Sequence, residues 1–152
     1  MRSSRENEQS SGKRRLTIFV DANTIVSGLA FEGNEALLLK LGAIGACDLK
    51  TTRYVIDEVD KALSGKEFGL ARDEIAALIS VVYNSVVVHE SVGGAQLEKY
   101  LPRLDDEKDA HIWAAYEKLR CDMLVTGDKE LLKKVTGAKT TRQTLERVIG
   151  KT

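Results

Sequence analysis

Acidic residues beside apolar segments are the feature of this chain with the clearest chemical potential. They are Asp21, Glu58, Asp109 and Asp128. Carboxylates gathered in one crevice repel one another, and a divalent cation bound between them removes that repulsion. Ligation by oxygen alone favours Mg²⁺ or Mn²⁺ over zinc, and one or two such ions can activate water for attack on phosphorus. The acids therefore predict a metal-dependent hydrolase that acts on phosphate esters.

Each acid also has a purely structural interpretation. Asp21 and Asp128 stand where they could cap the helix that follows, and Asp109 lies in a first helical turn, where a negative charge is favourable. Glu58 could be a surface residue in a salt bridge. For Asp21 the structural interpretation is weaker, because Asn23 could cap the same helix in its place.

The segments that must position these acids alternate between two periodicities. Short apolar or β-branched runs predict strands, and apolar residues spaced three and four apart predict helices. The expected strands are 16–20, 48–51, 86–88, 123–126 and 139–141; the expected helices are 34–46, 53–64, 71–84, 95–100, 106–120, 129–135 and 143–149. This alternation predicts an α/β fold with a mostly parallel sheet, in which ligands bind beyond the carboxyl ends of the strands.

The whole chain has the size and composition of one globular domain. It holds 152 residues, of which 43% are hydrophobic and 30% charged, and its net charge is zero. We expect a flexible tail at residues 1–14 and a single domain over 15–152. No apolar run approaches the ~20 residues that span a membrane, and no signal peptide is evident, so we expect a cytoplasmic protein.

Four segments of the sequence resemble those of PIN-domain ribonucleases, and most closely the toxin-like branch related to VapC-type toxins. They are FVDANTIVSGL, YVIDEV, DDEKDAHIWAA and MLVTGDKELL, and the resemblance runs from about residue 16 to about residue 149. It implies a Rossmann-like three-layer α/β/α sandwich. It also implies cleavage of RNA that depends on Mg²⁺ or Mn²⁺.

The resemblance assigns roles to individual residues of this chain. Asp21, Glu58, Asp109 and Asp128 match the catalytic acids that form the metal site. Asn23 and Thr126 match polar positions that support those acids through hydrogen bonds, and Asp106 matches a further acid near the third site. The same resemblance implies a homodimer and, for the toxins of the family, an antitoxin partner.

Basic residues near the acidic crevice are candidates for contact with RNA phosphates, which dominate the affinity of proteins for nucleic acids. Those that lie near predicted strand ends are Arg53, Lys108, Lys129 and Arg142. The alternative for each is an ordinary solvated surface charge.

Two other functions remain open at this point. The first is a phosphatase of the haloacid-dehalogenase type, with Asp21 as nucleophile. That mechanism needs a general acid two residues further on, where this chain has Asn23, which cannot donate a proton in that way. The second is a non-catalytic PIN-fold module that binds RNA or protein, whose signature would be the loss of one or more site acids.

Overall fold

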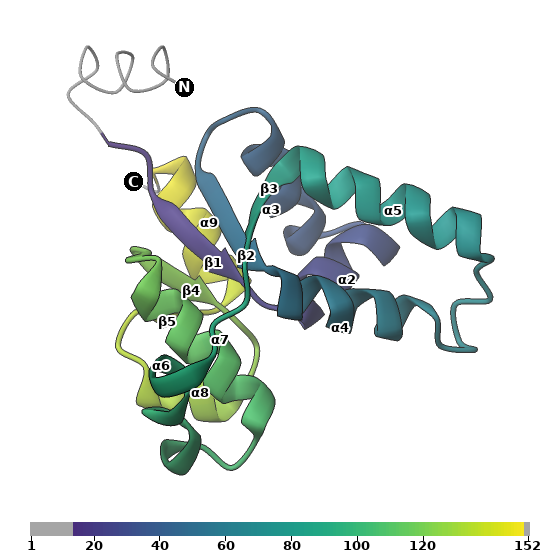
Figure 1. Ribbon diagram of the computed structural model, residues 1–152. Helices are drawn as coiled ribbons and strands as arrows, with labels where there is room; N and C mark the ends of the chain where they lie inside the picture. The colour runs from purple at the N-terminus through teal and green to yellow at the C-terminus, as the bar shows by residue number, and fades with distance from the viewer. Residues whose placement is uncertain (1–13, 151–152) are drawn as a thin grey trace.

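A five-stranded sheet forms the centre of the protein in a computed structural model that describes residues 14–150 (Figure 1). All the strand pairs within this range are parallel, in the order β3-β2-β1-β4-β5. The strands are β1 (Thr17–Val20), β2 (Asp48–Thr52), β3 (Val86–His89), β4 (Met123–Val125) and β5 (Ala138–Lys139). The predicted tail at 1–14 lies, except for Arg14, outside the described residues.

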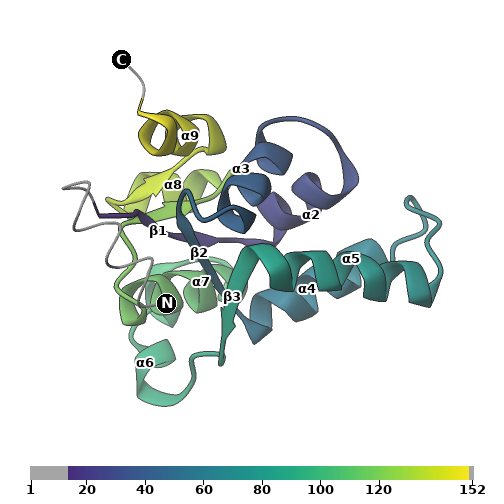
Figure 2. The same ribbon diagram turned by 90° about the horizontal axis from the view of Figure 1, so that it is seen from above.

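Helices cover both faces of the sheet, so the predicted three-layer α/β sandwich is confirmed. Figure 2 shows α2, α3 and α9 on one side and α6 and α7 on the other. The helices are α2 (Ala22–Ala30), α3 (Asn34–Ala43), α4 (Arg53–Leu63), α5 (Arg72–Ser85), α6 (Gly94–Glu98), α7 (Glu107–Lys118), α8 (Lys129–Lys134) and α9 (Thr141–Ile149), with a 3-10 turn at Leu101–Arg103.

The core is centred on β1 and β4, two of the three inner strands. Ile18, Phe19 and Val20 of β1 and the whole of β4 are buried, as expected for strands covered on both faces. The apolar stripes of α4 and α7 pack against this core. Because β1 and β4 cannot move without disrupting the core, residues directly after them are held in fixed positions.

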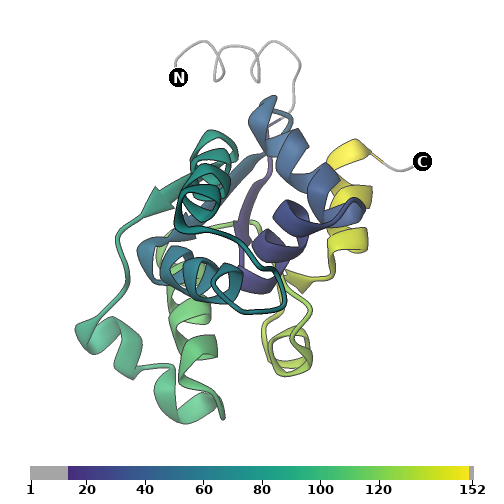
Figure 3. The same cartoon turned by 90° about the vertical axis from the view of Figure 1, so that its right-hand side faces the viewer.

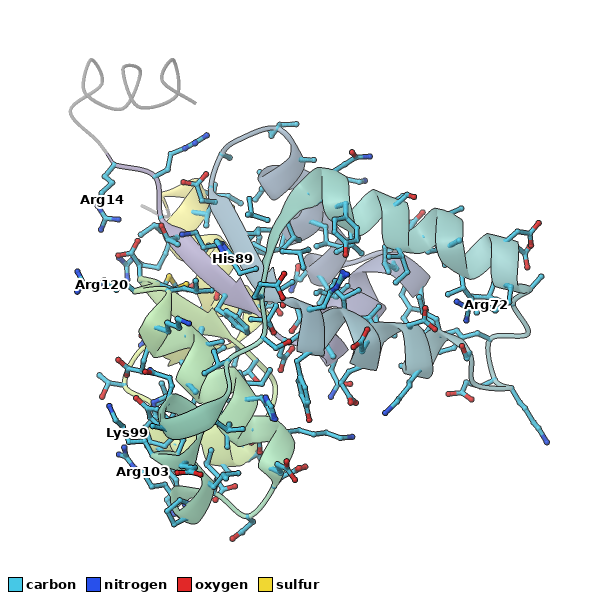
Figure 4. All side chains as sticks on the ribbon, in the orientation of Figure 1. Arg14, Arg72, His89, Lys99, Arg103 and Arg120 are labelled. Atoms are coloured by element: carbon cyan, nitrogen blue, oxygen red, sulfur yellow. The ribbon has the colours of Figure 1, made fainter. Side chains whose placement is uncertain are left out.

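Long helices α4 and α5 run beside each other and away from the sheet (Figures 1 and 3). Arg72, at the start of α5, forms a 3.0 Å ion pair with Asp60 of α4, and Figure 4 shows Arg72 at the end of the molecule far from the sheet. No helix in residues 14–150 is long and apolar enough to cross a membrane.

The edge strand predicted at 139–141 is wrong at its end. Thr141 already belongs to α9, because Thr140 and Gln143 form a capping box that starts the helix there. The Thr140 side chain accepts a hydrogen bond from the Gln143 amide, which a continuing strand would not allow.

Candidate active site

The acidic residues gather where the strand order changes direction. From β1 the chain moves outward to β2 and β3, and then returns to add β4 on the other side of β1. Such a switch point leaves a crevice outside the carboxyl ends of the two strands. Val20 pairs with Val125, so the residues that follow them, Asp21 and Thr126, meet at the floor of this crevice.

Asp21 is anchored by two hydrogen bonds. Its Oδ2 accepts one from the Thr126 hydroxyl at 2.6 Å, and its Oδ1 accepts one from the Thr24 amide at 3.0 Å. The second bond makes Asp21 itself the cap of α2, which begins at Ala22. The expectation that Asn23 could cap in its place was therefore wrong, since Asn23 already lies inside the helix. Each oxygen of Asp21 therefore accepts one hydrogen bond, and the residue still lines the crevice.

Asp128 and Asp106 also act as helix caps. Asp128 Oδ1 accepts a 2.9 Å hydrogen bond from the Leu131 amide at the start of α8. Asp106 Oδ1 accepts a 3.0 Å bond from the Lys108 amide at the start of α7. Both acids are exposed, and both line the same pocket as Asp21. Capping fixes where each carboxylate points without consuming all of its acceptor capacity.

Glu58 and Asp109 reach the crevice from helices α4 and α7. The Glu58 side chain is 19% exposed, and each of its oxygens has a lysine nearby. Lys108 Nζ lies 3.3 Å from Oε1, and Lys61 Nζ lies 3.9 Å from Oε2. Glu58 is thus neutralised by two exposed lysines, which can exchange for another positive charge.

One pocket of about 210 Å³ brings the predicted acids together. Its walls carry all four of the proposed metal-binding acids and two of the three supporting residues, Asn23 and Asp106. The complete lining is Asp21, Ala22, Asn23, Tyr54, Val55, Glu58, Asp106, Lys108, Asp109, Ile112 and Asp128. The third supporting residue, Thr126, is buried beneath the pocket, where it holds Asp21.

Burial and mutual repulsion disfavour negative charge in this pocket. Burial raises the pKa of Asp21 even though Thr126 and Thr24 donate hydrogen bonds to it, and the charge of Asp128 adds to the increase. Burial, followed by the charge of Asp128 and of Asp106, raises the pKa of Asp109 to about 7. A cation in the pocket would reverse this effect.

The donor set fits a hydrated Mg²⁺ or Mn²⁺. Within residues 14–150 no three acidic, histidine or cysteine side chains are already arranged to chelate one ion. Mg²⁺ keeps several of its waters and uses one or two carboxylates, so it does not need a closed cage. The wall of the pocket carries carboxylates, and it carries no histidine or cysteine. Carboxylate oxygens are the ligands that a hard cation selects. The pKa values of two of these carboxyl groups, Asp21 and Asp109, are raised in the absence of a cation.

The predicted basic residues do not share one location. Lys108 lines the acidic pocket, whereas Arg53 and Lys129 are exposed first residues of α4 and α8. Arg142 lines a different hollow, between α3 and α9, together with Leu37 and other residues of those helices. Of these four, only Lys108 stands on the wall of the acidic pocket.

Sequence reasoning missed Tyr54. Tyr54 lines the pocket, and its ring stacks on that of His111 with centroids 3.7 Å apart and planes 7° from parallel. The spacing of Tyr54 four residues before Glu58 would have placed it on the same helical face. His111 itself is not part of the pocket wall.

Comparison with known proteins supports the same fold. PAE2754 from Pyrobaculum aerophilum is 26% identical, with a TM-score of 0.68 over 90% of this chain and 91% of that one. VapBC2 from Rickettsia felis, solved with a DNA fragment of its promoter, is 12% identical, with a TM-score of 0.61 over 82% and 98%. VapC20 from Mycobacterium tuberculosis, a toxin that cleaves the sarcin-ricin loop, is 20% identical, with a TM-score of 0.58 over 78% and 95%.

A search of curated proteins found no match. A model of the PIN domain, however, matches residues 17–130, a range that contains all the acids of the pocket. This match covers well over half of the 152 residues. The chain therefore belongs to the PIN domain family.

Proposed function

We propose that this protein is a ribonuclease that depends on Mg²⁺ or Mn²⁺ and hydrolyses phosphodiester bonds of RNA. The observation that carries the proposal is the pocket at the switch point, where Asp21, Glu58, Asp109 and Asp128 share one wall. Membership of the PIN domain family supports it, as does the likeness in fold to a toxin that cleaves the sarcin-ricin loop.

The four acids would hold the metal, and Thr126 would keep Asp21 in position. When bound, such a metal lowers the pKa of a water and stabilises the negative charge that develops at phosphorus. Glu58 would exchange its lysine partners for the metal. Lys108, released from its 3.3 Å contact with Glu58, would then be free to bind a phosphate of the substrate.

The two alternative functions have less support. A phosphatase of the haloacid-dehalogenase type needs an acid at position 23, and Asn23 lines the pocket instead. A non-catalytic module would not need to keep all four acids, which cost stability when they are crowded together without a cation.

The test is cleavage of a mixture of short RNAs with Mg²⁺, with Mn²⁺ and with EDTA. We expect cleavage with either metal, none in EDTA, and a loss of at least about 100-fold in kcat/KM for Asp21→Asn and Glu58→Gln. The matched control is Asp57→Asn, an exposed acid beside Glu58 on α4 that is not part of the pocket wall. Cleavage that persists in EDTA or in Asp21→Asn would refute the proposal. Hydrolysis of p-nitrophenyl phosphate without RNA cleavage would point to the phosphatase.

We further propose that the protein is the toxin of a toxin–antitoxin pair and acts as a homodimer. The likeness in fold to VapBC2 and VapC20 supports the first part. Expression of the wild-type chain should arrest growth, whereas expression of Asp21→Asn should not, and a small reading frame beside the gene should relieve the arrest. Light scattering after size exclusion will give the oligomeric state, and a monomer at micromolar concentration would refute the dimer.

A further inference from the structure

Two aromatic rings stack beside the acidic pocket. Tyr54, the second residue of α4, lies parallel to His111 of α7, and the ring centroids are 3.7 Å apart. The stack therefore joins the first turn of α4 to α7. Tyr54 precedes Glu58 by one helical turn, so the stack stands directly next to the proposed metal site.

The two rings differ in what they offer to a ligand. The His111 side chain is 13% exposed, its Nδ1 is buried without a hydrogen-bond partner, and it is not part of the pocket wall. Tyr54 is half-buried and does line the pocket. The histidine therefore covers one face of the tyrosine ring, and the tyrosine lines the pocket where substrate would bind.

The chemistry of this wall suits the base of a nucleotide better than its phosphate. Acids crowd around Tyr54, and burial together with the charge of Glu58 raises the pKa of the phenol, so it stays neutral. A neutral ring attracts phosphate weakly, but every nucleobase has a π-face that stacks on aromatic rings. Lys108 on the same wall supplies the positive charge that a neighbouring phosphate needs.

We propose that Tyr54, held in place by His111, is a stacking platform for the nucleobase next to the scissile phosphate. This inference rests on the proposed ribonuclease function and adds a requirement to it: the substrate must present an unpaired nucleotide at the cleavage site. A base within a duplex is stacked between its neighbours and cannot reach the ring. Because His111 already fixes the ring, little side-chain freedom is lost on binding.

The test uses a short single-stranded RNA that carries 2-aminopurine, whose fluorescence falls when it stacks. Binding is measured with Mg²⁺ in the Asp21→Asn background, in which we expect cleavage to be at least about 100-fold slower. Adding Tyr54→Leu should weaken binding roughly 5- to 100-fold and remove the quenching. Adding Tyr54→Phe should preserve both. Tyr83→Leu is the matched control, because Tyr83 is exposed on α5 and lies outside the pocket wall.

A substrate without the base separates stacking from a merely structural role. Replacing the 2-aminopurine nucleotide by an abasic one should weaken binding to the protein that keeps Tyr54 by the same factor as the Tyr54→Leu substitution does. It should have no further effect on binding to the Tyr54→Leu variant. If the stack only joins α4 to α7, Tyr54→Leu will lower the melting temperature, and the abasic substitution will weaken binding equally with either residue at position 54.

The outcomes distinguish this inference from the proposed function. Wild-type cleavage of RNA together with unchanged affinity in Tyr54→Leu overturns the platform and leaves the ribonuclease intact. Quenching that depends on Tyr54, without cleavage by the wild-type protein, supports the platform and overturns the ribonuclease. The absence of any RNA binding overturns both.

Discussion

Removing the Thr126 hydroxyl tests how the floor of the pocket is held. Thr126 is 1% exposed, its hydroxyl donates to Asp21 at 2.6 Å, and it accepts a hydrogen bond from the Asp128 amide at 3.0 Å. Thr126→Val keeps the shape of the side chain and removes both bonds. A hydrogen bond to a charged group contributes about 1.5–3 kcal/mol, and a neutral one about 1 kcal/mol. Because the Asp128 amide is only partly buried and can turn to water, we expect the variant to lose about 2–3 kcal/mol of unfolding free energy.

The assay is urea denaturation at pH 7, paired with the Mg²⁺ dependence of RNA cleavage. Thr126→Val should also need more Mg²⁺ for half-maximal cleavage, roughly 10- to 100-fold more, because the carboxylate of Asp21 is no longer oriented. Thr126→Ser is the control: it keeps the hydroxyl and loses one methyl group, at about 1 kcal/mol. The reasoning is refuted if Thr126→Val is as stable as the wild type, or if the serine variant requires as much Mg²⁺ as the valine variant.

Three further predictions concern charge and packing. In EDTA, Asp109→Asn should be more stable than the wild type at pH 8 by about 1–2 kcal/mol. This is half or less of the free energy that a pKa raised to about 7 implies, because water screens the charge of a half-buried group. Because the wild-type fold binds that proton more tightly than the unfolded chain, the gain should shrink below pH 7 and vanish near pH 4; equal stability at pH 8 would contradict it. Asp122→Asn should lose about 0.5–1 kcal/mol of unfolding free energy at neutral pH, because the hydrogen bond from Arg14 lowers the pKa of Asp122. That stabilisation is present above about pH 4 and is lost in more acidic solution, so the urea denaturation curves of wild type and variant should converge there. Gly42→Ala should destabilise by about 1–3 kcal/mol although alanine favours helices, because its Cβ would lie 2.8 Å from the backbone oxygen of Ser85; a stabilised variant would show that α3 can shift.

The fold class and two of the acids could be predicted from local sequence. The apolar run that ends at Val20 makes a strand and the next residue is an acid, whatever the rest of the chain does. Asp128 likewise follows the run that ends at Val125, after only Thr126 and Gly127. Strands alternating with helices require a parallel sheet, and parallel strands bring their carboxyl ends to one edge.

Glu58 and Asp109 were harder to predict as site residues, because they lie on helices and a helix presents several faces. Val55 lies three residues before Glu58 and Ile112 three residues after Asp109, so each acid shares a helical face with an apolar residue. The resemblance to PIN domains singled out these two acids. The spacing could not show how deeply either acid is buried, or that Lys108 would lie against Glu58. Those facts depend on how α4 and α7 are rotated against each other.

What the sequence by itself determined is therefore the order of elements, the positions of the strand-end acids and the family. The tertiary structure alone decided that Tyr54 stacks on His111, 57 positions further along the chain, and that Arg142 lines a different hollow from Lys108. The physical reason is the range of the interactions. Strand propensity and helix capping act within a few residues, whereas contacts between side chains of different helices exist only once both helices have packed on the sheet.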